Sequence, residues 1–372
     1  MNSFSLGIAI LIAGFLFLAS SCKDPAPSDN KPPEQMWEWT VDTLVYDGPS
    51  PAPDQINIQC IWGSSGHDVL AVGTSDDILG EVWHYDGVKW HVVTERPYNG
   101  IDTGGSFLND VFAVSGFDSA NVFLFGHHGY FTTGTDLILK WNGHTWSTLP
   151  WEGGKAPTGA LTWGVKQNND KLWAVGSLGE VVEYTGQFLS VDTIIPGYRF
   201  WGPVIAALDG GEVYLNAYRD SVQGDTLPVG RSTKLYQRDL SGHWWLIEEK
   251  FVVGGWDDGN GLGSGLLSVG DRLFTPNRGL WERIGTSWVQ RTTFSGDGGS
   301  CLVSDLDMWI YYLRSLWHFD GHDWKTIDVP LLSGYTRFYL YGQGWSNGKE
   351  IFISLTENGM DSFILHGRLK GG

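Results

Sequence analysis

The chain has 372 residues and a formal net charge of −18, because 42 acidic residues outnumber 24 basic ones. Nucleic acids and anionic lipid surfaces are bound by clustered Lys and Arg side chains, so this balance argues against both as partners. The length fits two or three ordinary domains or one domain built from repeats, so internal repeats decide between these organisations.

The N-terminal residues 1–22 have the pattern of an export signal. The apolar run Leu6–Ala19 is too short to span a membrane comfortably and has the length of the apolar region of a signal peptide. The small residues before Cys22 resemble the bacterial lipoprotein box, which implies that Cys22 is acylated and becomes the mature N-terminus. Lys23 rather than Asp follows the cysteine, which favours an outer-membrane anchor. The alternative is an ordinary secretory signal cleaved near Ser21.

Residues 23–35 (KDPAPSDNKPPEQ) are rich in Pro and polar residues. Such a segment cannot bury a core, so we predict a disordered tether. Fully extended, it would hold the folded body up to about 40 Å from the membrane. The folded body is predicted to comprise residues 36–372.

A repeated pattern fills this body. Residues 60–73 (CIWGSSGHDVLAVG) align without a gap with 113–126 (AVSGFDSANVFLFG), and residues 161–176 repeat the pattern with two extra residues. Weaker copies are 204–217, 265–275, 301–313 and 338–354. Each copy alternates apolar residues around a turn, so seven hairpins are predicted.

A second hairpin follows the first in most copies. Its phrase, aromatic-(Asp/Asn)-Gly-x-x-Trp, is clearest in HYDGVKW at 84–90, KWNGHTW at 140–146 and HFDGHDW at 318–324. Asp-Gly or Asn-Gly between alternating apolar residues predicts a hairpin turn in which both central residues have positive φ. The Trp then begins the next strand and can cover the flank of its sheet.

Four short antiparallel strands, repeated about every 36–56 residues, fit the blades of a β-propeller. The seventh unit ends at 362–372 (SFILHGRLKGG) without a last strand. Residues 36–42 (MWEWTVD) resemble 89–95 (KWHVVTE) and would complete that blade from the N-terminus. This pairing would remove the open edge between the first and last blades. We therefore predict an all-β fold, a seven-bladed β-propeller whose N-terminal strand closes the last blade.

The repeat resembles that of secreted bacterial propellers in which WGSSxxDVxAVG is followed by HYDGxxW. These are loosely related to the kelch, Asp-box and photosystem II assembly factor propellers. The resemblance covers residues 36–372 and implies a fold rather than an activity, because propellers serve binding, scaffolding and hydrolysis alike.

Recurring positions favour a structural role for most tryptophans and for both cysteines of the body. The tryptophans that recur at one repeat position are interpreted as core between blades rather than as a carbohydrate surface: Trp39, Trp90, Trp146, Trp244, Trp288 and Trp324. Cys60 and Cys301 fall on the first strands of blades 1 and 6, so we expect two buried thiols without a disulfide.

Signals for catalysis are weak. Residues 295–302 (SGDGGSCL) have the spacing of a sialidase Asp-box, but they lie between blades. A sialidase-like glycan hydrolase would also need arginines such as Arg219, Arg231 and Arg337 to converge, and the sequence does not show that they do. Whether the chain is an enzyme stays open, with a non-catalytic module favoured.

Signals for a metal site are also weak. His127 and His128 are adjacent and would face opposite sides of a strand, and residues 257–261 (DDGNG) lack the alternation of a calcium loop. We expect no metal and no cofactor.

Long loops are the most informative remaining feature, because function on a rigid scaffold concentrates in irregular insertions. The loops 95–105, 127–136, 218–230 and 249–265 are predicted to emerge on one face of the propeller. They carry the candidate ligand-binding residues Tyr98, Asp102, His127, His128, Tyr130, Arg219, Trp256, Asp257 and Asp258. Aromatic side chains beside carboxylates and amides suit a sugar or a polar peptide. The alternative is a set of solvated loops without a particular role.

The sequence as a whole predicts a monomeric lipoprotein of the bacterial cell envelope, facing the periplasm or the cell surface. Its propeller would bind a glycan or an envelope protein through the long-loop face, and it would touch the membrane only through the lipid anchor. Two alternatives stay open. One is the sialidase-like hydrolase, and the other is an assembly scaffold with a broad apolar patch on its rim.

Overall fold

The computed structural model describes most of the chain between Met36 and Gly371. The described residues are 36–44, 46–47, 55–75, 82–93, 109–128, 135–152, 161–167, 171–195, 198, 204–223, 227–253, 260–263, 265–293, 300–303, 308–312, 315–319, 324–331, 338–339, 344–357 and 361–371. The predicted signal peptide with Cys22 and the tether 23–35 lie outside them. Trp37–Gly372 form one compact unit. Within the described ranges, no helix is long and apolar enough to cross a membrane.

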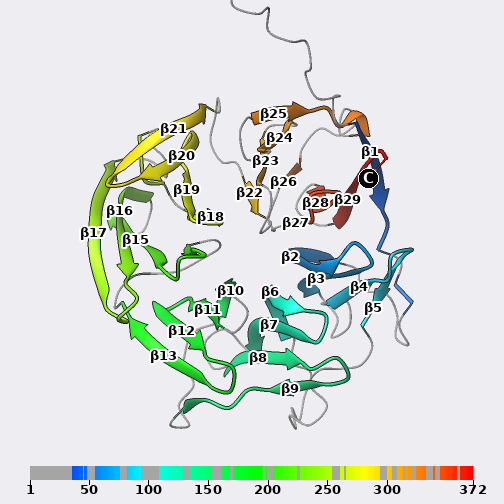
Figure 1. Ribbon diagram of the computed structural model, residues 1–372, viewed down its shortest axis with the longest axis horizontal. Coiled ribbons are helices and arrows are strands. Elements are labelled where there is room, and N and C mark those ends of the chain that lie inside the picture. Colours follow the sequence, from blue (N-terminus) through cyan, green and yellow to red (C-terminus); the bar gives the residue numbers. More distant parts are fainter. Residues whose placement is uncertain are drawn as a thin grey trace, which may run out of the picture. The chain divides into compact units, whose positions relative to one another are not determined.

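Seven small antiparallel sheets stand around a central axis as the blades of a propeller (Figure 1). Blade 1 consists of β2 (Ile56–Ser65), β3 (Asp68–Ser75), β4 (Val82–Tyr85) and β5 (Trp90–Val92), and blade 2 of β6 (Asn109–Asp118), β7 (Asn121–His128), β8 (Thr135–Trp141) and β9 (Trp146–Thr148). Blade 3 consists of β10 (Leu161–Gln167), β11 (Lys171–Gly176), β12 (Glu180–Tyr184) and β13 (Leu189–Ile194), and blade 4 of β14 (Ile205–Ala207), β15 (Val213–Gln223), β16 (Leu227–Arg238) and β17 (Trp244–Val253). Blade 5 consists of β18 (Leu267–Val269), β19 (Arg272–Pro276), β20 (Gly279–Ile284) and β21 (Ser287–Thr293), and blade 6 of β22 (Ser300–Val303), β23 (Met308–Tyr312), β24 (Ser315–Phe319) and β25 (Trp324–Ile327). Blade 7 consists of β26 (Phe338–Tyr339), β27 (Trp345–Ser346), β28 (Glu350–Glu357) and β29 (Asp361–Leu369), together with β1 (Trp37–Asp42). The predicted fold class is confirmed, with the first strand of each blade nearest the axis.

The N-terminal strand closes the ring as predicted. β1 pairs antiparallel with β29 over six residue pairs, so the first strand of the sequence becomes the outermost strand of blade 7. The innermost strand of this blade is split into the short pieces β26 and β27, which both pair with β28. A single parallel pair between Ile56 of β2 and Asp361 of β29 also joins blade 7 to blade 1.

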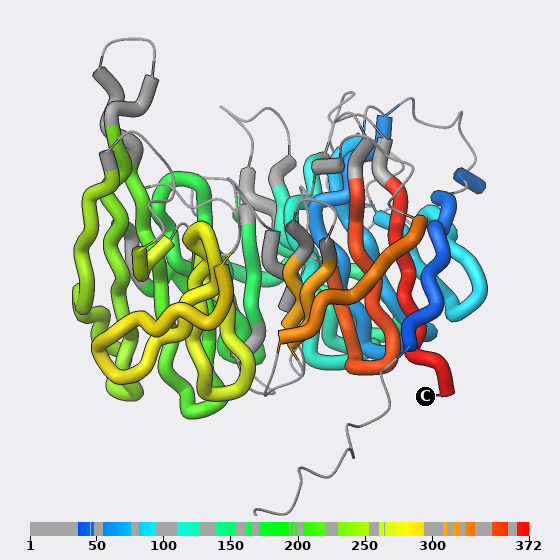
Figure 2. Tube along the Cα trace, turned by 90° about the horizontal axis from the view of Figure 1, so that it is seen from above, coloured from blue at the N-terminus to red at the C-terminus, as the bar shows by residue number. Residues whose placement is uncertain are grey.

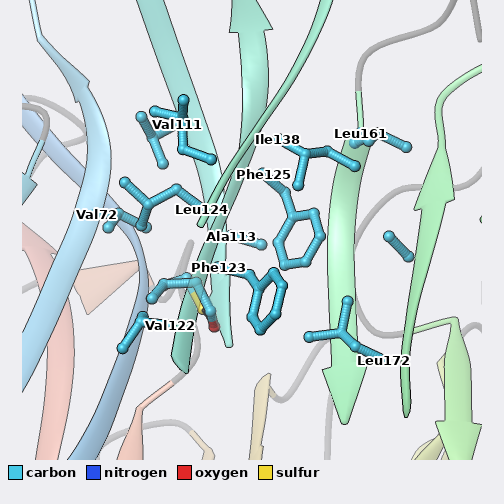
Figure 3. Close-up of a cluster of buried hydrophobic side chains, with 14 of the residues drawn as sticks. Val72, Val111, Ala113, Val122, Phe123, Leu124, Phe125, Ile138, Leu161 and Leu172 are labelled. Carbon is cyan, nitrogen blue, oxygen red and sulfur yellow. Dashed lines mark hydrogen bonds between the residues drawn. The ribbon is translucent and has the colours of Figure 1, made fainter. Parts of the chain in front are cut away.

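Apolar side chains fill the spaces between blades. Where blades 1, 2 and 3 meet, Val72 of β3, Phe123 and Phe125 of β7 and Leu172 of β11 belong to one buried cluster (Figure 3). Five further clusters fill the remaining spaces between neighbouring blades. The predicted packing tryptophans are buried in these clusters or lie against them: Trp39, Trp90, Trp146, Trp244, Trp288 and Trp324. They are therefore core residues, as the repeat indicated.

Three of these indoles also hydrogen-bond across a blade boundary. In each case Nε1 donates to a carboxylate on the outermost strand of the preceding blade. The pairs are Trp90 with Asp42 (3.1 Å), Trp244 with Asp192, and Trp288 with Glu248 (2.8 Å). A buried indole N–H needs an acceptor, so these bonds set the position of one blade against the next as well as satisfying the N–H group.

The turn between β4 and β5 differs from the prediction that both of its central residues have positive φ. A four-residue connection joins β4 and β5, and of its first two residues only Gly87 has a positive φ, of 93°. Asp86 keeps an ordinary backbone conformation because its Oδ1 accepts the backbone N–H groups of Val88 (2.8 Å) and Lys89 (2.9 Å). These bonds, with a weaker contribution from a nearby histidine, lower the pKa of Asp86 to about 2. The aspartate thus folds the turn through its side chain.

The glycine that recurs on the first strands marks a close contact between blades. Gly63 and Gly116 occupy the same repeat position. A Cβ at Gly116 would lie 2.7 Å from the Trp62 ring, and one at Gly63 would lie 3.0 Å from the Trp345 ring. In both cases the ring comes from the preceding blade, so a larger residue would force neighbouring blades apart.

Cys60 and Cys301 lie on the first strands of blades 1 and 6, as predicted. The Cys60 thiol is buried, and its Sγ lies 3.6 Å from the carbonyl oxygen of Val114. Burial raises its pKa to about 12, so it stays protonated and unreactive at neutral pH. The side chain of Cys301 is outside the described part of the chain.

Candidate functional site on the long-loop face

The propeller has two faces with different connections. Because consecutive strands of a blade are antiparallel, the loops between second and third strands leave on the same face as the connections between blades. We call this the long-loop face. The opposite face carries the turns between first and second strands and between third and fourth strands, and we call it the turn face.

Three of the four predicted long loops prove to be partly strand. Residues 218–223 and 227–230 belong to β15 and β16, and residues 249–253 belong to β17. His127 and His128 are the last two residues of β7, and β8 begins at Thr135. The prediction of loops was wrong there because cross-strand pairing continues beyond the repeated hairpin.

The nine predicted site residues differ in how far the structure describes them. Tyr98, Asp102, Tyr130, Trp256, Asp257 and Asp258 lie outside the described residues. For His127 and His128 only the backbone is described. Arg219 is described in full, and it is an exposed residue of β15. Carbohydrate as the ligand class rested on the undescribed aromatics and stays a prediction.

Arg219 stands on the part of blade 4 that extends beyond its inner strand. β14 pairs only with Val213–Leu215, whereas β15 and β16 stay paired as far as Gln223 and Leu227. This upper part of β15, β16 and β17, residues 217–223, 227–234 and 249–253, is called the blade 4 ridge. Figure 2 shows the yellow-green strands of blade 4 at the left edge of the ring.

One cross-strand row on the ridge presents an arginine and an aromatic ring on the same side of the sheet. Arg219 pairs with Ser232, which pairs with Phe251, so the three side chains share one face. Phe251 is 57% exposed, and its ring lies over Gly230, where a Cβ would come within 2.6 Å of Cζ. None of the described residues forms an ion pair with Arg219. The row therefore offers a cation and a positioned aromatic ring to a partner.

The next row fixes the base of the ridge. Lys234 Nζ lies 3.4 Å from Glu249 Oε1 and 5.6 Å from the centroid of the Tyr198 ring. Hydrogen bonding to Tyr198, and secondarily to Glu249, raises the pKa of Lys234. The lysine is therefore a fixed positive charge between Glu249 of blade 4 and Tyr198 of the connection that leads into this blade.

The arginines do not assemble a sialidase-like site in the described residues. Arg231 pairs with Asp220, the residue after Arg219, so Arg231 and Arg219 point to opposite faces of the sheet. Arg231 is 2% exposed and stacks on Tyr218, with its guanidinium carbon 4.2 Å from the ring centroid. Arg337 lies outside the described residues, as does most of the Asp-box-like segment.

The connection from blade 4 to blade 5 is anchored beside the ridge. Asn216, fully buried on β15, donates Nδ2 to the carbonyl of Gly263 at 2.8 Å. Thr275, fully buried on β19, accepts from Gly263 N at 3.0 Å and donates to Gly265 O at 2.7 Å. The described end of this predicted loop is therefore a fixed part of the long-loop face.

Among the described residues, no group of three or more side chains is arranged to hold a metal ion. Phe251, Lys234, Glu249 and Tyr198 were not singled out from the sequence. The stretch 231–238 (RSTKLYQR) does not alternate between polar and apolar residues, so it carries no clear signal that the strands of blade 4 are long.

Comparisons with known proteins support the fold. No family model and no curated protein matches the chain. A solved structure of YCF48 bound to a D1 peptide superposes with a TM-score of 0.52 at 15% identity, covering 90% of this chain and 95% of that one. The structure of PorZ, a surface component of the type-IX secretion system of Porphyromonas gingivalis, gives a TM-score of 0.51 at 12% identity. That match covers 87% of this chain but 37% of PorZ, and at these identities the likeness shows a common propeller fold.

Proposed function

We propose that this chain is a non-catalytic, protein-binding propeller of the bacterial cell envelope that meets its partner with the blade 4 ridge. The observation that supports this most directly is the row of Arg219, Ser232 and Phe251. Arginine and aromatic residues are enriched among the side chains that dominate protein interfaces. Since the ring and the backbone of this row are already ordered, binding would cost little conformational entropy.

A polypeptide is the first ligand class to test. YCF48, which shares the fold, was solved with a peptide bound, and PorZ is described as a bacterial surface component. The acidic composition of the chain argues against nucleic acid on electrostatic grounds. The envelope location rests on the lipoprotein-like N-terminus, in which Cys22 would carry the lipid and residues 23–35 would form the tether.

Site-specific photo-crosslinking tests the ridge. A benzoyl-phenylalanine residue placed at position 219 or 251 of the full-length protein, in living cells, should give a discrete crosslinked protein band. The matched control is the same residue at Val88, which is 84% exposed on a turn of blade 1. Bands at position 88 but not at 219 or 251 would contradict the proposal.

Substitutions on the ridge test whether the crosslinked partner depends on individual side chains. Arg219→Ala and Phe251→Ala should reduce crosslinking from Ser232, because each removes a neighbouring contact on the same face. Both side chains are exposed, so each change should alter stability by less than about 0.5 kcal/mol. A melting curve that stays unchanged while crosslinking falls would separate binding from folding.

The anchor has an independent test. Cys22→Ser should abolish labelling by a palmitate analogue and release the protein from the membrane fraction, and Cys60→Ser should not. Labelling that persists in Cys22→Ser would favour the ordinary secretory signal instead.

A further inference from the structure

A corner of blade 4 on the turn face exposes two large apolar side chains. Leu240, in the turn between β16 and β17, is 77% exposed, and Trp245, the second residue of β17, is 58% exposed. This position contrasts with Trp244, which packs between blades 3 and 4. An exposed tryptophan at such a corner is a typical centre of binding energy in protein interfaces.

Hydrogen bonds hold the Trp245 side chain in place. Trp245 donates Nε1 to Asp239 Oδ2 at 2.9 Å, and Asp239 Oδ1 accepts the backbone N–H groups of Ser241 and His243, each at 2.9 Å. Hydrogen bonds from the Ser241 hydroxyl and from Trp245 lower the pKa of Asp239, so this carboxylate stays charged. Leu240 lies against the neighbouring turn of the same blade. The Trp245 ring is therefore already positioned for a partner.

The two residues belong to one continuous surface. Trp245 pairs with Gln237, and Gln237 pairs with Tyr214, so these side chains share a face. Gln237 Nε2 donates to Glu212 Oε1 at 3.0 Å, which places this carboxylate beside the residue that pairs with Trp245. On the other side, Leu240 Cδ2 is 2.9 Å from the position of a Cβ on Gly211.

The charge of this surface is acidic. The turns at 208–212, 239–243 and 270–271 contain no Lys or Arg, and they carry the carboxylates of Asp209, Glu212, Asp239 and Asp271. Asp271 Oδ1 accepts the N–H of Gly210 at 2.6 Å, which ties the turns of blades 4 and 5 together. The nearby guanidinium groups of Arg238 and Arg283 are paired with Asp192 and Glu248, at 3.1 and 2.8 Å.

We propose that this acidic corner, formed by Leu240, Trp245 and the four carboxylates, docks a segment of a partner protein in which arginines alternate with apolar residues. An arginine would stack on the Trp245 ring while carboxylates neutralise its charge, and an apolar residue would cover Leu240. A second copy of the chain is disfavoured because each copy carries −18 charges. The corner lies on the face opposite the ridge and is independent of it.

Fluorescence anisotropy tests this docking with a labelled peptide of alternating Arg and Leu residues, beside a peptide with Glu in place of Arg. The purified body should bind the Arg peptide and not the Glu peptide. Trp245→Ala and Leu240→Ser should each weaken binding about tenfold. Asp209→Asn with Asp271→Asn should weaken it about threefold and reduce its salt dependence. Phe188→Ala, a change at a residue 47% exposed on a turn of blade 3, is the matched control.

Three outcomes would overturn the proposal. Equal affinity of all variants for the Arg peptide would show that the basic peptide is attracted to the acidic protein in general and not to this corner. Absence of binding by the folded wild type, with circular dichroism unchanged, would remove the proposed ligand class. A wild-type dimer in sedimentation that Trp245→Ala dissociates would make a second copy the occupant.

Discussion

The closure between blades 7 and 1 and the outer half of blade 4 are built from the same repeat, but they bury very different amounts of apolar surface. At the closure, Trp90 is 3% exposed, and Phe352 and His366 are 0% and 1% exposed. On blade 4, Trp245 and Phe251 are 58% and 57% exposed. The closure therefore contributes to stability, whereas the large side chains of blade 4 remain available for binding.

Hydrogen bonding follows the same division. Asp42, the last residue of β1, accepts Trp90 Nε1 at 3.1 Å and lies 3.2 Å from His366 Nδ1, so it links β1 to β29 and to blade 1. His366 also stacks on Phe352 with ring centroids 3.9 Å apart. On blade 4, Asp239 holds Trp245 in an exposed position instead. The same type of contact, an indole N–H donating to a carboxylate, joins two blades at the closure and holds Trp245 in an exposed position on blade 4.

Removal of β1 should have the largest effect. A deletion of residues 36–42 takes away Trp37, Trp39 and Val41, which pack against the cluster between blades 6 and 7. Each of these partly buried side chains contributes up to roughly 1.5–3 kcal/mol, and the six residue pairs with β29 are lost as well, so the free energy of unfolding should fall by about 5 kcal/mol. Urea unfolding followed by circular dichroism measures this. Deletion of residues 23–35 is the control and should change nothing, while an unchanged midpoint for the first deletion would refute closure by β1.

The stability costs of replacing one buried and one exposed tryptophan compare the core with the surface directly. Trp83→Ala removes a side chain with 0% exposure from the cluster between blades 7 and 1 and should cost about 3–5 kcal/mol. Trp245→Ala, at 58% exposure, should cost less than about 1 kcal/mol. The melting temperatures of the two variants provide the measurement. Similar losses would mean that Trp245 supports the fold and is not reserved for binding.

The pH dependence of the closure follows from Asp42. Burial opposes its ionisation, but the hydrogen bond and charge of His366, with the bonds from Trp90 and Thr40, outweigh burial and lower its pKa from 3.8. A folded-state pKa below the unfolded value means that the stabilisation is complete above about pH 3.8 and is lost as the pH falls through the lower folded value.

Asp42→Asn should therefore cost roughly 1–3 kcal/mol at pH 7, as expected for hydrogen bonds to a charged group. The difference from wild type should shrink as the pH falls below about 4. Unfolding free energies of both proteins between pH 3 and 7 measure it. A difference that is constant over this range would show that ionisation of Asp42 has no part in the closure.

The smallest expected effect is the difference in stability between substitutions of Trp90 and Trp39, which lie on the outermost strands of neighbouring blades. Trp90→Phe loses the hydrogen bond to Asp42 and should cost about 1 kcal/mol more than Trp39→Phe. Trp39 Nε1 is buried without a hydrogen-bond partner among the described residues, so its replacement loses only packing. Chemical unfolding of the two variants compares them, and equal costs would contradict a stabilising role for the bond across the blades.

The hairpins, the blade number and the closing strand could all be predicted, because they are encoded locally. Alternating apolar residues on both sides of a turn signal make each hairpin recognisable by itself. In the described part of the chain, the segment of β1 belongs to no hairpin of its own, and the only blade that lacks a last strand is blade 7, where β1 pairs with β29. The buried position of Trp90 followed from its recurrence in the repeat.

Other features depend on neighbours that lie far away in the sequence. The bond from Trp90 to Asp42, for example, joins residues 48 positions apart. The length of β15 and β16 was decided by continued pairing beyond β14, which turned a predicted loop into the ridge that carries Arg219. Local patterns determined which segments become strands, but only the packing of blades against one another decided which side chains are buried and which remain exposed for a partner.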